Sequence, residues 1–297
     1  MVHLNKCPLC NSQEIVTHLR CRDHFLSNEE FELFRCVSCG FIFTQDHPDE
    51  ISSGRYYESD EYASHNDASA GFSNMLYRFS RKIMLSKKRR LAVKLTGIKS
   101  GKLLDIGSGS GHFLSEMKNS GWDVRGIEIN EKARTLSEKK FNLTVLLPAN
   151  MNSLEAGSFD CITLWHVLEH FHDPFMYAGE INRLLKPGGI CIAAMPNSGS
   201  FDANYYLSTW AAYDVPRHLW HFNPETFEKF SGKAGLQLIK TAALPLDVFY
   251  ISILSEKYRG SKFYFFAGII KGAWFSLCSL FRKNKASSLI YILKKLS

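Results

Sequence analysis

A glycine-rich turn directly after a short apolar segment constrains the fold of this chain more than any other feature. Residues 102–106 (KLLDI) have the composition of a buried strand, and Gly107, Gly109 and Gly111 follow at alternate positions. Glycine has no Cβ atom, so a ligand can approach the main chain closely at such a turn. A helix that begins after the turn directs its free N–H groups toward the same ligand. The pattern predicts a nucleotide-type site at the carboxyl end of a strand.

The spacing of the glycines argues against a dinucleotide. A dinucleotide-binding turn has the spacing Gly-x-Gly-x-x-Gly, whereas Gly109 is followed by glycine after two positions and by His112 after three. The carboxylate of Asp105 would repel a pyrophosphate, but it suits a ligand with a cationic end. Glu128 ends the next expected strand, where a carboxylate can accept hydrogen bonds from both hydroxyls of a ribose.

Strands and helices alternate through the middle of the chain, which is typical of a parallel sheet. Helices are expected at 75–95, 111–120, 131–140, 176–185 and 224–234, and strands at 102–106, 123–128, 143–147, 159–165, 190–195 and 236–243. Lys87 to Arg90 form a basic run that we interpret as the solvated face of the first helix rather than as a nucleic-acid patch. Residues 287–295 are expected to form a last strand.

Several spaced blocks together resemble the class I methyltransferase family that uses S-adenosylmethionine. They are LLDIGSGSGHFL, GIEIN, SFDCITLWHVLEHFHDP, INRLLKPGG and the pair Pro196-Asn197, and they cover about residues 80–243. The resemblance implies a Rossmann-like, seven-stranded, mostly parallel sheet with helices on both faces. It also implies that the seventh strand is antiparallel and lies at the C-terminus, so residues 80–244 and 287–297 would form the core and residues 245–286 an insertion.

The resemblance also implies where the cofactor binds. The backbone of the glycine turn would hold the methionine end, and Glu128 the ribose. Asn150 stands where the family often has an Asp near the adenine, and Met151 would stack on the base. The predicted cofactor-binding residues are Asp105, Gly107, Ser108, Gly109, Gly111, Glu128, Asn150 and Met151.

The candidate catalytic residues lie at and just beyond the end of the fourth expected strand. Methyl transfer to an oxygen requires removal of a proton, and histidine titrates near neutrality. His166, Glu169 and His170 are therefore candidates for the general base. Because Glu169 and His170 match positions that the family shares among members with different acceptors, a role in shaping the cofactor pocket is the alternative.

A second polar cluster follows the fifth strand at residues 213–219 (YDVPRHL). One interpretation is an acceptor-facing wall, with Tyr213, Asp214 and Arg217 binding the substrate and His218 acting as the base. The other is an ion pair between Asp214 and Arg217 that stabilises the loop.

Two Cys-x-x-Cys pairs predict a zinc site in residues 1–45. Cys7 with Cys10 and Cys36 with Cys39 can supply four thiolates to one tetrahedral Zn²⁺. Four thiolates leave no open position, so the zinc would be structural, and it would stabilise a module too short to bury a core of its own. Residues 46–79 are polar and are expected to form a linker or lid, with Tyr56 and Tyr57 as lid residues.

The basic charge of the chain is confined to its C-terminal part. Nine Lys and Arg, and no Asp or Glu, fall within residues 257–297, so the net charge of +7 leaves the first 256 residues at −2. The main body thus offers no charge argument for nucleic acid. Residues 263–281 are apolar, with one Lys and basic flanks. One interpretation is a helix that lies on an anionic membrane surface through residues 262–285, and an equal alternative is a helix that packs on the body or on a dimer partner. A membrane span is the less favoured interpretation.

The sequence therefore predicts an S-adenosylmethionine-dependent methyltransferase for a small-molecule acceptor. Similarity to bacterial enzymes with an N-terminal cysteine module favours O-methylation of a sugar, a nucleotide-sugar or a lipid-linked sugar. There are two alternatives. One is an RNA methyltransferase that binds RNA through the zinc-ribbon-like module of residues 1–45, and the other is a non-catalytic protein that retains the cofactor-binding fold. The polar N-terminus and the paired cysteines favour the cytoplasm.

Overall fold

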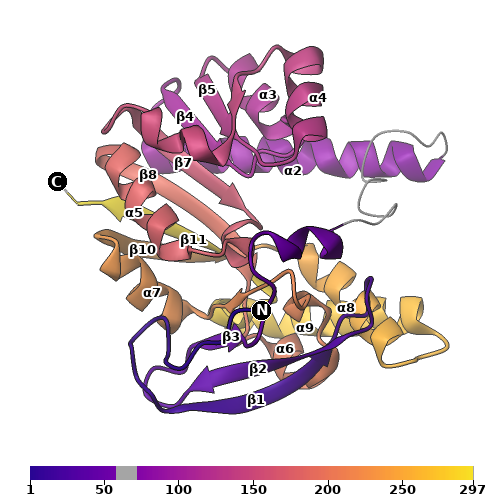
Figure 1. The fold of residues 1–297 in the computed structure, drawn as a ribbon. Helices are drawn as coiled ribbons and strands as arrows, with labels where there is room; N and C mark the ends of the chain where they lie inside the picture. Colours follow the sequence, from indigo (N-terminus) through magenta and orange to yellow (C-terminus); the bar gives the residue numbers. More distant parts are fainter. Residues whose placement is uncertain (58–71, 297) are drawn as a thin grey trace.

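The structure, a computed structural model, describes residues 1–57 and 72–296, which form two sheets (Figure 1). The larger sheet has the strand order β10-β11-β8-β7-β4-β5-β6. Its strands are β4 (Lys102–Ile106), β5 (Asp123–Ile127), β6 (Val145–Leu146), β7 (Phe159–Trp165), β8 (Leu185–Pro196), β10 (Leu236–Ala243) and β11 (Ser288–Lys295). Strand β11 is antiparallel to both of its neighbours and the other pairs are parallel. The predicted Rossmann-like sheet of seven strands is confirmed.

Helices cover both faces of this sheet because its central strands are apolar on both sides. On β4, Leu103 packs with α2 (Phe72–Thr96) and α3 (His112–Asn119). The next residue, Leu104, points to the opposite face and joins the core cluster that includes α5 (Pro174–Leu184) and α7 (Pro224–Lys233). Helix α4 (Glu131–Phe141) is capped by the preceding residue, Asn130, whose side chain accepts a hydrogen bond from the N–H of Ala133.

Strand β8 begins earlier than expected. The sequence places a helix end at 185 and a strand only from 190, whereas Leu185 already pairs with Phe159 of β7. Regular pairing resumes at Cys161 and Ile190, so the Lys186–Gly189 segment forms an irregularity within the strand. Both Phe159 and Leu185 are buried, which favours the early pairing.

The smaller sheet joins the N-terminal segment to the middle of the chain. Its order is β1 (Ile15–Arg22), β2 (Glu30–Cys36), β3 (Ile42–Thr44) and β9 (Trp220–His221). The hydroxyl of Thr44 donates a hydrogen bond to the carbonyl of His218 at 2.7 Å. The N-terminal strands therefore pack directly against the core (Figure 1), and one strand of their sheet comes from residues beyond 200.

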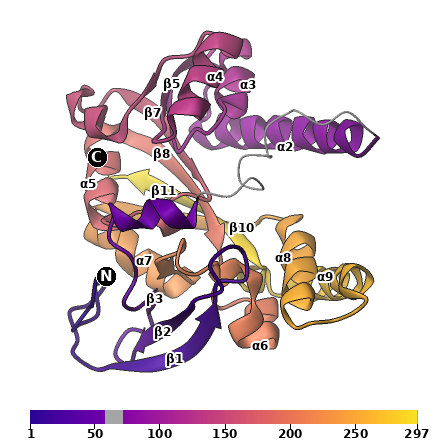
Figure 2. The same ribbon diagram turned by 45° about the vertical axis from the view of Figure 1, so that its right-hand side comes forward.

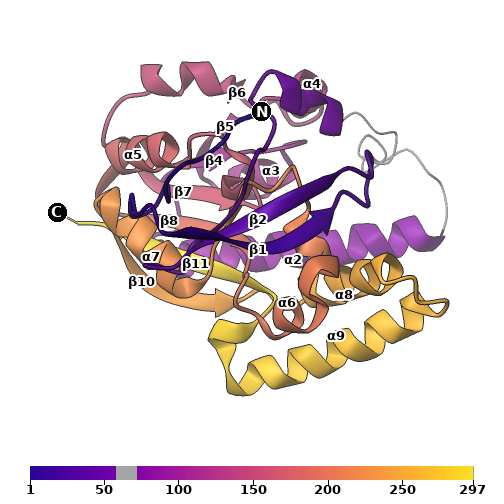
Figure 3. The same cartoon turned by 60° about the horizontal axis from the view of Figure 1, so that its bottom comes forward.

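The insertion before β11 forms two helices that lie side by side (Figures 2 and 3), α8 (Asp247–Tyr258) and α9 (Tyr264–Phe281). Their close contact depends on glycine: a Cβ atom on Gly268 would lie 2.4 Å from the Cα atom of Ile253. The remaining helices are α6 (Phe201–Tyr206), η1 (Ser52–Tyr56), η2 (Pro148–Ser153), η3 (Leu168–His170), η4 (Leu207–Thr209), η5 (Ala211–Tyr213) and η6 (Lys283–Lys285).

Most of α9 is exposed along the edge of the molecule (Figure 3). Within the helix only Gly268, Gly272 and Phe275 are buried. Trp274 is 60% exposed and Ile270 is 68% exposed. Among the helices of the described residues, α9 is the one that is long and apolar enough to cross a membrane.

Candidate active site

The glycine turn between β4 and α3 has the backbone conformation that its sequence predicts. Gly107, Gly109 and Gly111 have φ angles of +72°, +52° and +76°, which residues with a Cβ atom rarely adopt. A Cβ atom on Gly107 would lie 2.4 Å from Cγ2 of Val167, whereas one on Gly109 would meet no atom of residues 1–57 or 72–296 within 4 Å. The turn is thus packed against the segment after β7 at its first glycine and open to a ligand at its second.

The carboxylate of Glu128 lies beside this turn. Its Oε2 atom accepts a hydrogen bond from the N–H of Gly109 at 2.7 Å, and its Oε1 atom accepts one from Asn130 at 2.8 Å. The hydroxyl of Ser108 is buried and has no hydrogen-bond partner among the described residues. A carboxylate, an unpartnered hydroxyl and an open glycine at one turn fit the ribose and the polar end of S-adenosylmethionine.

Asp105 is buried beneath the turn. The hydroxyl of Thr163 on β7 donates a 2.6 Å hydrogen bond to its Oδ1 atom. Burial raises the pKa of Asp105 to about 7, although the bond from Thr163 and the nearby ammonium of Lys88 oppose the shift. A cationic ligand next to Asp105 would favour its charged form.

The two residues predicted near the adenine differ in exposure. Asn150 and Met151 lie in η2, after β6. The Asn150 side chain is exposed, whereas Met151 is buried in the core cluster together with Ile127. Their contact with a base stays a prediction.

His166 is held by two carboxylates at the end of β7. Its φ angle is +58°, and its N–H donates to the carbonyl of Ala194 on β8. Its Nε2 atom lies 3.0 Å from Oδ2 of Asp247, and its Nδ1 atom lies 3.5 Å from Oε1 of Glu169. Burial would lower the pKa of His166, but Asp247 and then Glu169 outweigh it and raise the pKa to about 10. A protonated imidazole cannot accept a proton, so this geometry does not fit the predicted role of general base.

Glu169, His170 and His218 come together although His218 lies far along the chain. One nitrogen or oxygen atom of each lies within 4.8 Å of those of the other two. His170 is placed by the carbonyl of Arg217, 3.1 Å from its Nδ1 atom, and by the hydroxyl of Tyr57, at 3.2 Å.

The ionisation of this cluster follows from burial and from the three histidines. Burial would raise the pKa of Glu169, but His166, His218 and His170 lower it to about 2. Burial lowers the pKa of His170 to about 4, with a further contribution from His218. At neutral pH a carboxylate therefore faces a neutral His170.

Arg217 does not fit its predicted role in substrate binding. The side chain is buried, and its Nη2 atom contacts Asp214 at 2.7 Å and Asp23 at 2.8 Å. Its Nη1 atom donates to the carbonyl of Tyr56, and its Nε atom donates to Asp214. All three nitrogens are thus used within the protein. The ion pair stabilises the loop, as the alternative interpretation proposed, and also ties it to the N-terminal segment.

Tyr213 and Asp214 also belong to this packed region. Tyr213 is buried against Trp210 and His221, with ring centroids 4.9 and 5.1 Å away. Asp214 is partly exposed, and its Oδ2 atom lies 3.8 Å from Nε2 of His218. Of the predicted substrate-binding residues, Asp214 alone combines solvent exposure with proximity to the cluster.

Sequence reasoning missed two charged residues of the site. Asp247 begins α8 in the insertion, and nothing in the local sequence connects it with His166. Lys88 was expected in solvent, but its ammonium lies 4.1 Å from the centroid of the Trp165 ring, and burial lowers its pKa. Both depend on which elements pack at the carboxyl edge of the sheet.

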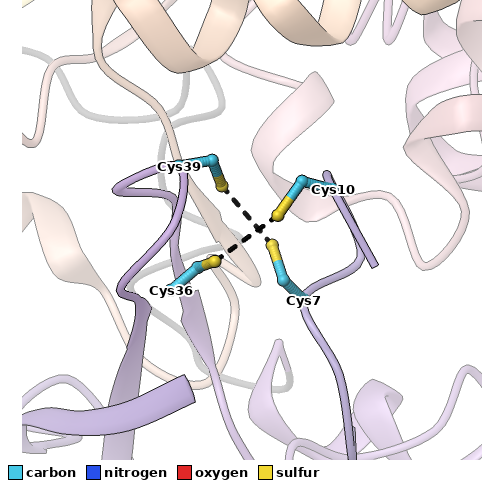
Figure 4. A group of neighbouring side chains, drawn as sticks. All are labelled: Cys7, Cys10, Cys36 and Cys39. Atoms are coloured by element: carbon cyan, nitrogen blue, oxygen red, sulfur yellow. Dashed lines mark hydrogen bonds between the residues drawn. The ribbon is translucent and has the colours of Figure 1, made fainter. Parts of the chain in front are cut away.

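The four N-terminal cysteines converge as predicted (Figure 4). The Sγ atoms of Cys7 and Cys39 lie 3.6 Å apart, and those of Cys10 and Cys36 lie 3.5 Å apart. A tetrahedral zinc with Zn–S bonds of about 2.3 Å requires sulfur separations of about 3.8 Å. None of the four forms a disulfide. The donor set and its spacing fit a Zn²⁺ ion.

Comparison with known proteins identifies the core. Residues 76–241 match the family described as methyltransferase domain. A ubiquinone biosynthesis O-methyltransferase of Psychrobacter cryohalolentis is 34% identical over 110 residues, which are 34% of this chain and 43% of that protein. One of Cupriavidus pinatubonensis is 26% identical over 173 residues, 52% of this chain and 69% of that protein. The chain therefore spans less than half the length of the first of these relatives.

A solved structure shares the fold. Phosphoethanolamine N-methyltransferase 2 of Haemonchus contortus, in complex with S-adenosyl-L-methionine, superimposes with a TM-score of 0.50 at 19% identity, over 71% of this chain and 53% of that one. The match to the family model covers more than half of the sequence. The chain therefore belongs to the methyltransferase domain family, and its core is a class I, S-adenosylmethionine-dependent methyltransferase domain.

Proposed function

We propose that the chain methylates a hydroxyl group of a small molecule. The observation that carries the proposal is the cluster of Glu169, His170 and His218. Glu169 and His170 directly follow Val167, which packs against Gly107 of the cofactor turn. S-adenosylmethionine supplies the methyl group when bound and leaves as a neutral thioether, while the acceptor oxygen forms the new O–C bond and loses its proton. The chain aligns the two reactants and accepts that proton at the cluster.

We propose a sugar-related acceptor, and specifically a lipid-linked sugar. The resemblance to bacterial enzymes that carry an N-terminal cysteine module supports the sugar. The relatives named for ubiquinone biosynthesis support an oxygen acceptor, and they make a ubiquinone precursor the second candidate.

The test is transfer of tritiated methyl from S-adenosylmethionine to four acceptor groups: nucleotide-sugars, polyprenyl-linked sugars, phenolic ubiquinone precursors and bulk RNA. We expect label in a sugar class. His218→Ala should lower turnover by about 10²-fold or more if the cluster removes the proton, and cofactor binding should persist. Label in the phenols alone would make a ubiquinone precursor the acceptor instead of a sugar, and label in RNA would contradict a small-molecule acceptor. Intact cofactor binding without any label would point to a non-catalytic protein.

We also propose that α9 rests on an anionic membrane surface on the cytoplasmic side. Its exposed side chains include Phe266, Ile270, Trp274 and Phe281, and no Asp or Glu occurs after Glu256. Lys262, Arg282 and Lys283 flank the helix and match the charge of anionic headgroups. A lipid-linked acceptor would then be presented beside the site, because α8, which packs on α9, contributes Asp247.

Flotation with vesicles that contain anionic lipid tests this surface. The protein should float with anionic vesicles at low salt and less with neutral ones, and the double substitution Ile270→Ser and Trp274→Ser should abolish flotation. Ile239→Ser, an exposed apolar residue on β10, is the matched control. If the protein does not float but forms a dimer, and the double substitution in α9 disrupts that dimer, the helix packs against a second copy of the chain instead.

A further inference from the structure

We propose that Glu169, His170 and His218 bind a divalent transition-metal ion beside the cofactor turn, separate from the four-cysteine site. The role of the ion in catalysis rests on the proposed function, methylation of a hydroxyl group, whereas the binding of the ion does not. The three residues lie on η3 and on the loop before β9.

The donor atoms are arranged as metal ligands are. His218 directs its Nδ1 atom to the carbonyl of Ala212 at 2.9 Å, and His170 directs its Nδ1 atom to the carbonyl of Arg217 at 3.1 Å. A carbonyl only accepts, so each Nδ1 atom carries a hydrogen, and each Nε2 atom is left to coordinate an ion through the lone pair of the neutral ring. Histidines that bind metals are held in this way.

Glu169 supplies the third donor and the strongest reason to expect a ligand. The residue is 1% exposed, yet within the described part of the chain neither carboxylate oxygen has a hydrogen-bond partner. His166 lies 3.5 Å from Oε1, which leaves Oε2 available. A buried carboxylate without hydrogen bonds is costly, and coordination would satisfy it.

The separations and the surrounding charge both suit a divalent ion. The three donor atoms lie within 4.8 Å of one another, and tetrahedral ligands at about 2.1 Å from one ion are about 3.4 Å apart. Loading would draw the three side chains together to that spacing. The ion pairs connected to the cluster contain four carboxylates and two cations; they are Asp23, Glu169, Asp214 and Asp247, and His166 and Arg217. With the nearby ammonium of Lys88 counted, the surplus is one negative charge.

Two imidazoles and one carboxylate leave coordination positions open for a substrate oxygen. With the ion bound, the cluster would act on the proton through the metal and would not accept it directly, because a hydroxyl coordinated there would release its proton to water more readily. The oxygen lone pair would then form the bond to the methyl carbon while the carbon–sulfur bond breaks and its electron pair stays on sulfur.

Titration with Mn²⁺, followed by electron paramagnetic resonance, tests the site without an activity assay. Mn²⁺ prefers oxygen donors such as the Glu169 carboxylate and binds thiolates poorly, so zinc in the thiolate site stays in place. The wild-type protein should bind one Mn²⁺ per chain. Glu169→Gln and His218→Asn should each weaken binding by about 10²-fold or more, whereas His172→Asn, just outside the cluster, should not.

Cofactor affinity and circular dichroism identify any variant that fails to fold, and Co²⁺ absorption gives a second probe. Wild-type protein that binds neither ion, or folded variants that bind Mn²⁺ as tightly as wild type, would overturn the proposal. Metal binding without transfer to any hydroxyl acceptor would leave this site standing and contradict the proposed function instead.

Discussion

The Nε2 atom of His166 lies 3.0 Å from Oδ2 of Asp247, and this contact connects the end of β7 with the first residue of α8. His166 also faces Glu169, so one side chain links the helical insertion to the polar cluster. The insertion is thereby coupled to the site and not merely attached to the sheet edge.

Asp247→Asn should destabilise the protein because it removes the charged partner of His166. Both side chains are partly exposed, so the expected cost is about 1–2 kcal/mol, between the values for surface and buried pairs. Urea unfolding of Asp247→Asn, His166→Gln and the double variant measures the coupling. Additive effects of the two single substitutions would show that the contact contributes nothing to stability.

Cofactor affinity should increase as the pH rises through about 7. Burial raises the pKa of Asp105 to about 7, so the free protein holds it protonated below that pH and charged above it. The charged form attracts the cationic methionine end, so the dissociation constant should fall by up to about tenfold per pH unit near the transition. Calorimetry at pH 6 and pH 8 measures the change. Asp105→Asn should remove the dependence, and the exposed Asp123→Asn should retain it.

Gly107→Ala should be more destabilising than Gly109→Ala. Both residues have positive φ angles, which cost an alanine about 1–2 kcal/mol. Only the Cβ atom at position 107 would also collide with Val167, so this variant should in addition displace the segment that carries Glu169. Thermal unfolding and cofactor titration of the two variants make the comparison, and equal losses of stability would argue against the contact with Val167.

Arg217→Ala should act on stability and not on substrate affinity. The substitution leaves Asp23 and Asp214 without their cation, and removal of one partner from a buried pair costs about 3–5 kcal/mol. Unfolding experiments should show this loss, and hydrogen exchange should increase in β1 and β2. A normal unfolding midpoint together with a raised KM would restore the substrate-binding role.

Cys10→Ser should release the zinc that we propose for the N-terminal site. The expected zinc content falls by one ion per chain, and the melting temperature falls with it because the metal stabilises a segment with little core of its own. Elemental analysis and thermal unfolding provide the measurements. Cys278→Ser, a thiol on α9 outside the site, is the control and should keep both values.

Local patterns were enough to predict the core sheet and the cysteine site. The glycine turn, Glu128 at a strand end and the two Cys-x-x-Cys pairs act through neighbours in the chain, where backbone geometry limits the possibilities. The antiparallel last strand followed from the family resemblance. The early start of β8 could not be predicted from the sequence, because the pairing of Leu185 with Phe159 depends on burial and not on local propensity.

The sequence by itself therefore determined the fold class, the cofactor turn and the four thiolates. Only the tertiary structure decided which charged residues meet. The sequence left Arg217 open between the substrate and an ion pair, and its contacts with Asp23 and Tyr56 favour the ion pair. His166 is a candidate base by sequence, but Asp247 lies beside it. These partners lie far apart in the chain, and the free energy of burying a charge depends on what packs around it, which no local pattern records.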